Sequence, residues 1–352
     1  MPSSFLLWAL IGLVLMTSIS AFLPSRFSAA NREPQVLEFV EAKSGGKVIL
    51  VGAMHYNPVS IARARDVTTA VAARGALSCV LLETCKQRWM EGETMRAALS
   101  PFELSLYKAV LPSEMAAAAE VAQTTPGARL ILGDQSIETT GVQFKACLAA
   151  TLADLLDPLN GGWKRIADDI MLVFSGAGDA AEGLGVTLAD YTDPALLINM
   201  PVSFLRYPTA IAVRSPKTVV LVASAVWLLE NLGDLLPAAS SVFPADGTAE
   251  SWLATIAVTF LETLFLGRVM LGPILNERNE VLARNIAAAC ARASADGEDG
   301  GTVVAILGMA HLNGVQRLLL EKGASSSSTN EVMPADEVVF LPCGQGEVKA
   351  VA

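Results

Sequence analysis

The chain has few histidines, few basic residues and no paired cysteine motif, and these shortages limit what it can do. It has 352 residues, with 25 Lys and Arg against 35 Asp and Glu, which gives a net charge of −10. Nucleic-acid binding needs a basic surface, and the sequence contains no strong Lys or Arg cluster. We therefore expect no nucleic-acid partner.

The five cysteines are odd in number and include no C-x-x-C pair, so they do not predict a disulfide or zinc framework. Cys79 lies in a predicted strand and Cys290 in a predicted helix, where both are expected to be small buried residues. Cys85 lies two residues after Glu83, and a cysteine nucleophile paired with a histidine is an alternative there. The others are Cys147 and Cys343.

The N-terminus predicts a leader in two parts. Residues 1–21 have an apolar core but no positive n-region, and they end in a plausible signal-peptidase site before Phe22. Residues 22–34 carry hydroxyl and basic side chains with no acid before Glu33, as transit peptides do. Together they resemble the bipartite plastid leaders of diatoms and related algae, which predicts a plastid location. The secretory pathway or an organelle membrane, reached through a signal anchor, is the alternative.

Both histidines of the chain end a G-x-x-H tetrad that follows an apolar run. The first run and tetrad span 47–55 and the second 302–311. Glycine makes up about 7% of an average protein, so finding it three residues before both histidines is roughly a one in 200 event. Each copy predicts a strand, a tight turn and a helix, with the imidazole at the strand's carboxyl end. Open α/β sheets place their ligand sites there.

These two copies predict an α/β fold of two βαβ-type half-repeats. Unbroken apolar runs are typical of strands buried on both faces, so we expect a mainly parallel sheet with flanking helices. If the two histidines share a site, the residues between them form one domain. That domain is predicted at 35–322 with a large apolar helical insertion at 200–275. A Ser-rich linker and a C-terminal strand or tail follow at 323–352.

A third predicted strand, 77–82, ends directly before Glu83. A helix from about Pro58 to Arg74 separates it from the first tetrad, and a right-handed crossover would bring both side chains to the same edge of the sheet. His55, His311 and Glu83 would then match a three-ligand catalytic metal site with an open position for water. Alternatives are that Glu83 caps the next helix and that both histidines are hydrogen-bonded to backbone.

Three further charged positions are candidates for the same edge. Asp134 follows another apolar strand that ends at Gly133. Glu277 and Arg278 open the helix that leads into the second tetrad strand, after an apolar stretch, and are expected to point back at the sheet. Glu280 and Arg284, later in that helix, are interpreted as its solvated face.

Taken in order, these motifs resemble the TraB/PrgY family, which is similar to the Tiki proteases and, more distantly, to erythromycin esterases and ChaN haem-binding proteins. The resemblance covers about Val36 to Leu320. It implies one site made by His55, Glu83 and His311, with four residues near it: Arg88, Asp134, Glu277 and Arg278. Two positions depart from the family pattern, because Gln135 stands where members often carry Arg and Asn279 where many carry Asp.

The resulting hypothesis is a metal-dependent hydrolase acting on a peptide or small ester. A divalent metal, with Zn, Mn, Fe and Co all compatible with the ligand set, would activate water, and Arg88 or Arg278 would stabilise the oxyanion. One alternative is metal-free hydrolysis with histidine as general base. Another is a non-catalytic, membrane-associated protein that binds peptides or tethers an organelle.

Two apolar stretches, 217–241 and 251–275, bear on membrane association. The uncharged core of the first, 219–229, is too short to span a bilayer. The second is long enough but contains Glu262 and Arg268, which cost a few kcal/mol each in lipid unless they are paired. We expect a buried or amphipathic helical hairpin over 217–275, with membrane association as the alternative.

Overall fold

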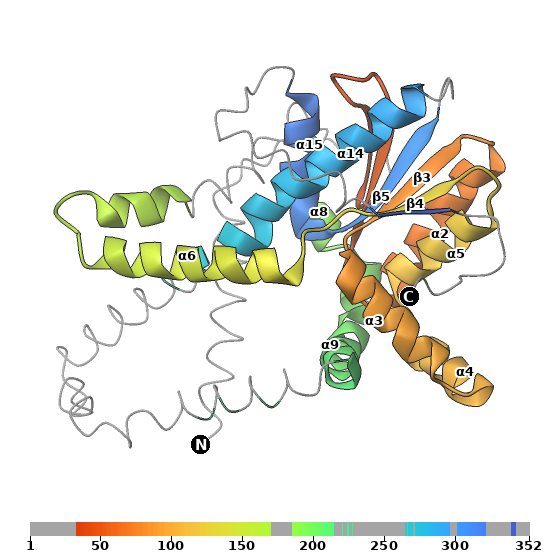
Figure 1. The fold of residues 1–352 in the computed structure, drawn as a ribbon, viewed down its shortest axis with the longest axis horizontal. Coiled ribbons are helices and arrows are strands. Elements are labelled where there is room, and N and C mark those ends of the chain that lie inside the picture. The colour runs from red at the N-terminus through yellow and green to blue at the C-terminus, as the bar shows by residue number, and fades with distance from the viewer. Residues whose placement is uncertain are drawn as a thin grey trace.

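A computed structural model of the chain describes residues 33–169, 185–214, 272–295, 301–321 and 339–342, with a few single positions between 220 and 269. Its centre is a sheet with helices on both faces (Figure 1). The strands are β1 (Val36–Val40), β2 (Lys47–Ala53), β3 (Leu77–Leu82), β4 (Arg129–Leu132), β5 (Thr302–Gly308) and β6 (Val339–Pro342).

The strand order is β1-β2-β5-β3-β4-β6. β2, β5, β3 and β4 are parallel, whereas β1 and β6 pair antiparallel at the two edges. β5 follows β2, β3 and β4 in the sequence, yet it inserts between β2 and β3. The carboxyl ends of the four parallel strands therefore meet at one edge. The prediction of an α/β fold with a mostly parallel sheet and flanking helices is confirmed.

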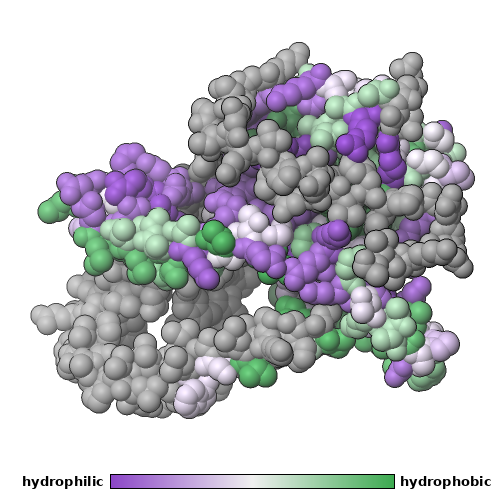
Figure 2. Space-filling model, in the orientation of Figure 1, coloured by the Kyte–Doolittle hydropathy of each residue, from purple (hydrophilic) through white to green (hydrophobic). Residues whose placement is uncertain are grey.

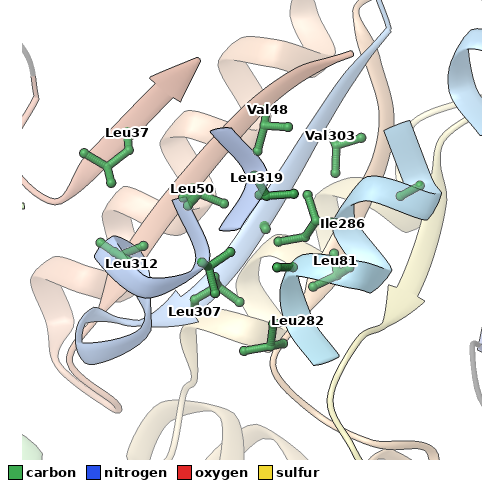
Figure 3. Packing of buried hydrophobic residues seen from close by; sticks show 14 of the residues in the cluster. Leu37, Val48, Leu50, Leu81, Leu282, Ile286, Val303, Leu307, Leu312 and Leu319 are labelled. Carbon is green, nitrogen blue, oxygen red and sulfur yellow. The ribbon is translucent and has the colours of Figure 1, made fainter. Parts of the chain in front are cut away.

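The apolar runs form strands because both faces of the sheet are covered. Along β5, Ala305 and Leu307 pack on one face while Val304 and Ile306 pack on the other, as the two-residue period of a strand requires. The first face is covered by α14 (Glu277–Ala295) and α15 (Leu312–Leu320), and Figure 3 shows Leu282 of α14 among the packed side chains. The second is covered by α2 (Pro58–Ala73) and α5 (Glu114–Thr124).

Local signals explain where the helices near the sheet edge begin. Asn57 caps α2 by accepting the Val59 N–H at 3.0 Å, and Pro58 occupies the first helical position, where its missing N–H costs nothing. After β5 the chain forms a short 3-10 turn, η3 (Met309–His311), and enters α15 directly. The helix predicted from Pro58 is therefore present, and a helix also follows His311.

The remaining helices lie around this core. They include α3 (Lys86–Ala97), α4 (Pro101–Val110), α6 (Ile137–Leu155), α8 (Leu188–Tyr191), α9 (Pro194–Arg214) and a π-helical turn, η2 (Gly272–Asn276). α6 extends away from the sheet (Figure 1). α4 presents an apolar stripe to solvent, because Phe102, Leu106 and Val110 lie one turn apart and are all exposed. Hydrophobic side chains also reach the surface at several other places in the face drawn in Figure 2.

Only part of the predicted apolar insertion can be compared with the structure. α9 is helical to Arg214, whereas 217–241 and 251–275 lie largely outside the described residues. Arg268 is described, and its guanidinium pairs with Asp154 at 2.6 Å and with Asp169 at 2.7 Å. This basic side chain of the second apolar stretch therefore has acidic partners within the protein.

By length and composition, the described helix Pro194–Val213 could cross a membrane, and 17% of its apolar window is buried. A core helix can pass the same test. The predicted leader lies outside the described residues except for Glu33 and Pro34, and so does the Ser-rich linker. A strand is present at the predicted C-terminal position, as β6.

Candidate functional site

His55, Glu83 and His311 come together around Gly308, at the carboxyl edge of the parallel strands. A Cβ placed on Gly308 would lie 3.3 Å from Oε2 of Glu83, 3.6 Å from Cδ2 of His311 and 3.7 Å from Nε2 of His55. The insertion of β5 between β2 and β3 explains this convergence, since each side chain follows one of three neighbouring strands. Glycine at 308 leaves the space that the three side chains need.

Glu83 is the buried centre of this group, with 5% of its surface exposed. Its Oε2 accepts the Gly308 N–H, and its Oε1 accepts from Arg278 and lies 3.3 Å from Nε2 of His311. Burial alone would raise the pKa of Glu83, but His311 and Arg278 reverse this and hold the pKa well below its usual range. Glu83 does not cap α3, because the N-cap of that helix is Cys85.

His311 is enclosed, with 3% of its surface exposed. Its Nδ1 lies 2.7 Å from Oδ1 of Asn279, and its Nε2 faces Glu83. Both ring nitrogens therefore lie against side-chain oxygens, one of Asn279 and one of Glu83. A Cβ on Gly314 would lie 2.3 Å from Nδ2 of Asn279, so only glycine at 314 leaves room for this amide. The neutral side chain of Asn279 therefore orients the His311 ring.

His55 lies in a different environment. Its Nδ1 lies 2.6 Å from Oε1 of Glu114, the first residue of α5, and Glu114 is only 2% exposed. Oε2 of Glu114 also accepts the Tyr56 N–H at 3.2 Å. When Nδ1 carries the proton shared with Glu114, Nε2 is the basic nitrogen of the neutral ring. Burial alone would lower the pKa of His55, but Glu114 raises it above its ordinary value.

Two arginines and Asp134 support the floor of the site. Arg278 Nε and Nη2 donate to Asp134 at 2.9 and 2.8 Å, and Nη2 also bonds Glu83. Arg88 bonds Asp134 through Nη2 and contacts Sγ of Cys85 through Nε at 3.4 Å. The Arg88 side chain is 39% exposed, against 13% for Arg278. Arg88 is therefore the arginine with a surface free to meet a ligand.

A cavity of about 500 Å³ opens over these residues. His55, Glu83, Arg88 and Arg278 all line it, together with residues of α3, α5 and α9. Tyr207 of α9 stacks against the His55 ring, with the ring centroids 6.1 Å apart. The cavity thus combines a partly exposed imidazole, three guanidinium groups, several carboxylates and apolar walls.

The structure places most of the predicted site residues at this edge, but not Glu277. Glu277 is exposed at the first position of α14 and bonds Gln143 of α6, and burial is the first cause of a raised pKa for its carboxyl. Successive residues of a helix point about 100° apart, so Glu277 and Arg278 cannot both face the sheet. Glu277 does not line the cavity, and a role for it at the site stays a prediction. Glu280 and Arg284 are exposed, as predicted.

The donor atoms do not fit a metal ion in this arrangement. Within the parts of the chain that the structure describes, no group of three or more His, Cys, Asp or Glu side chains could hold one. Both oxygens of Glu83 accept hydrogen bonds, and both ring nitrogens of His311 lie against side-chain oxygens. Arg278 holds the position beside Glu83 that a cation would need. A bound divalent metal stays a prediction.

Two residues of the site were not predicted from the sequence. Glu114 precedes an alanine-rich helical segment that carries no chemistry, and a single acid in a first helical turn is ordinarily a dipole or capping residue. Tyr207 lies within the apolar stretch that was interpreted only as an insertion. No feature of their local sequence marks either of them, because their roles depend on where α5 and α9 pack.

Comparison with known proteins leaves the family open. No protein-family model matches the chain, and no curated protein matches it. The resemblance to the TraB/PrgY family therefore stays a prediction that rests on the ordered motifs.

Proposed function

We propose that the protein is a hydrolase of small esters or peptides in which His55 is the general base. The observation that carries this proposal is the position of His55, whose Nδ1 is held by the buried Glu114 while the ring lines the cavity. An imidazole that is oriented by a carboxylate and lines a pocket is suited to take a proton from water. This is the metal-free form of the hydrolase hypothesis.

In the proposed reaction, Nε2 of His55 removes a proton from water as the water oxygen attacks the substrate carbonyl carbon. The carbonyl oxygen gains negative charge, and Arg88 stabilises it through the exposed part of its guanidinium. The tetrahedral intermediate then collapses, the bond to the leaving group breaks, and His55 returns the proton to the leaving alkoxide or amine. Arg278 and His311 act on the reaction only by holding Glu83 in place.

The two G-x-x-H units are proposed as half-repeats that serve this one site. Two observations support this: their strands, β2 and β5, are parallel neighbours, and a helix begins soon after each histidine. In this proposal the first unit supplies the base and the second supplies the support beneath it.

The test uses protein purified without chelators, assayed on a panel of p-nitrophenyl esters and short peptides. Bound metal is measured by mass spectrometry in the wild type and in His55→Ala, Glu83→Ala and His311→Ala. We expect hydrolysis that survives exhaustive chelation and is lost in His55→Ala. Stoichiometric metal that falls in all three variants, with activity lost on chelation, would instead establish the metal-dependent mechanism. Unchanged activity in His55→Ala would overturn both.

A second function, membrane association without catalysis, is favoured by one observation on α9. Phe204 and Leu205 are 69% and 73% exposed on a helix of mainly apolar composition. Exposed apolar helix residues bind membrane interfaces in proportion to the area they bury. Flotation of the full chain with anionic vesicles, compared with a Phe204→Ser, Leu205→Ser variant, tests this. Equal flotation of the two proteins would argue against α9 as the contact.

A further inference from the structure

A second cavity of about 660 Å³ lies beside the site cavity, walled by α3, α4 and α5. Four residues line both cavities: Trp89, Arg96, Ser113 and Ala116. Each volume falls within the range of about 300 to 1,000 Å³ that is typical of small-ligand sites. Because the two cavities share a wall, a ligand bound at His55 has a second compartment next to it.

Three basic and two acidic side chains line the second cavity. Arg65 and Lys108 both approach Glu120, at 3.7 and 3.6 Å, and Arg96 bonds Glu93 at 2.5 Å. Each cation that lines this cavity has a carboxylate near it, with Glu120 shared by two of them, so a charged ligand group would compete with these ion pairs. Much of the remaining wall is apolar or aromatic: Ile61, Leu104, Tyr107, Leu111, Pro112 and Ala117. These surfaces favour an uncharged, apolar occupant.

The boundary between the compartments is a stacked pair on α3. The guanidinium carbon of Arg96 lies 5.7 Å from the ring centroid of Trp89, which is a cation–π contact. The two residues are seven apart, so they lie on the same face of the helix. The Arg96 side chain is only 19% exposed, because Trp89 and Glu93 hold it against the protein. An extended ligand would have to pass along this pair.

We propose that the substrate is an ester or amide with a linear apolar acyl chain. Its carbonyl lies at His55, and its chain extends past Trp89 and Arg96 into the second cavity. This inference rests on the proposed hydrolase function and narrows its substrate class. It predicts a preference for medium-length acyl groups over acetyl groups, since the remote methylenes would be buried in the second compartment.

The test compares p-nitrophenyl acetate, butyrate and octanoate in the full chain and in two matched variants. Ala97 lines the second cavity but not the site cavity, and Ala98 lines neither. A tryptophan at 97 should fill the second compartment, whereas Ala98→Trp controls for the new side chain. For the wild type we expect kcat/KM to rise with chain length by up to about fourfold per methylene. In Ala97→Trp the octanoate advantage should fall by roughly tenfold or more, with acetate turnover nearly unchanged.

A binding measurement separates this inference from the proposed function. N-methyl octanamide is titrated by calorimetry into wild type, Ala97→Trp, Ala98→Trp and His55→Ala. If no ester is turned over, the proposed function fails, yet binding that is retained in His55→Ala and lost only in Ala97→Trp still supports the second compartment. Equal binding by Ala97→Trp and Ala98→Trp, or no binding by the wild type, overturns it. Ester turnover that does not depend on the length of the acyl chain also overturns the inference.

Discussion

The two histidines end similar tetrads, yet their surroundings are opposite. The His55 side chain is 33% exposed, is paired with the charged Glu114 and lines a cavity. The His311 side chain is 4% exposed, is paired with the neutral Asn279 and faces the carboxylate of Glu83. One sequence pattern thus gives a ring available to a ligand and a ring enclosed by the protein. The partners that make this difference come from α5 and α14, far from either tetrad in the sequence.

A shift of one residue between the strands contributes to the difference. In the parallel pairing of β2 and β5, Gly308 lies opposite Ala53, so the two tetrads are out of step by one position. After β2 the chain passes through Tyr56 at a φ of 60° before α2 begins, and His55 lines the cavity. After β5 the 3-10 turn begins at once and places His311 beneath α14.

The largest expected effect is the loss of activity in His55→Asn, compared with the loss of stability in His311→Asn. Asn can place an amide N–H where Nδ1 of histidine lies, so it can keep the donor but provides no base. His55→Asn should lower kcat by about a thousandfold, as loss of a general base does, with a small change in Tm. His311→Asn should instead lower stability by about 1 to 3 kcal/mol, because Glu83 loses a partner. Ester hydrolysis and thermal unfolding of both variants measure this, and similar losses at both positions would break the comparison.

The next largest expected effect is that of Glu83→Gln on the free energy of unfolding. Removing one partner from a buried charge network costs about 3 kcal/mol or more, because Arg278 would keep its charge beside a neutral amide. Urea unfolding measures the loss, and Glu91→Gln on the exposed face of α3 is the matched control, with an expected change within about 0.5 kcal/mol.

The pH dependence of that loss has a definite sign. The pKa of Glu83 is lowered in the folded protein, so its contribution to stability is complete above its ordinary pKa. The contribution is lost as the pH falls below that value toward the lowered one. The stability difference between wild type and Glu83→Gln should therefore shrink in acid. A difference that grows in acid would mean that Glu83 is protonated in the folded protein.

A smaller effect is expected at Gly314, which leaves room for the amide that orients His311. A methyl group there would lie 2.3 Å from Asn279, so Gly314→Ala should cost about 1 to 3 kcal/mol by overpacking. Gly141→Ala in α6 is the control, because a Cβ there meets nothing within 4 Å and alanine favours the helix. Chemical denaturation of both variants tests the pair. An equal response would mean that Asn279 can move without cost.

Much of the fold could be predicted from the sequence because its signals are local. The apolar runs of β2, β3, β4 and β5 each end in a polar or glycine position, and helices begin where Pro58 and the charged start of α14 indicate. The same reasoning brought His55, Glu83 and His311 to one edge, since parallel strands align their carboxyl ends.

The chemistry of the site could not be predicted in the same way. The predicted metal set treats the two histidines as equivalent ligands, whereas Glu114 and Asn279 give them different charged surroundings. Those partners come from other elements, so no pattern around the tetrads contains them. Glu277 does not line the cavity beside Arg278, because adjacency in the sequence does not put two helical side chains on one face.

The smallest expected effect concerns the charge of Glu114 and its control of His55. Glu114 raises the pKa of His55, and only the neutral imidazole can take a proton from water. Activity in the wild type should therefore rise with pH through a value above the ordinary histidine pKa. Glu114→Gln removes the negative charge, so this rise should move to lower pH, with the plateau of kcat/KM about tenfold lower because the base is weaker.

The linked effect on stability has the opposite direction in pH. A raised pKa means that the His55–Glu114 pair stabilises the fold fully below the ordinary histidine pKa, and that this contribution is lost as the pH rises through the raised value. Wild type and Glu114→Gln should thus differ most in stability at mildly acidic pH, where both are least active. The stability difference could be largest in mild acid while the pH–rate profiles of the two proteins coincide. That result would make His55 a structural histidine like His311. A shift in the rate profile that coincides with the stability change would assign the base to His55, since one proton would then govern both.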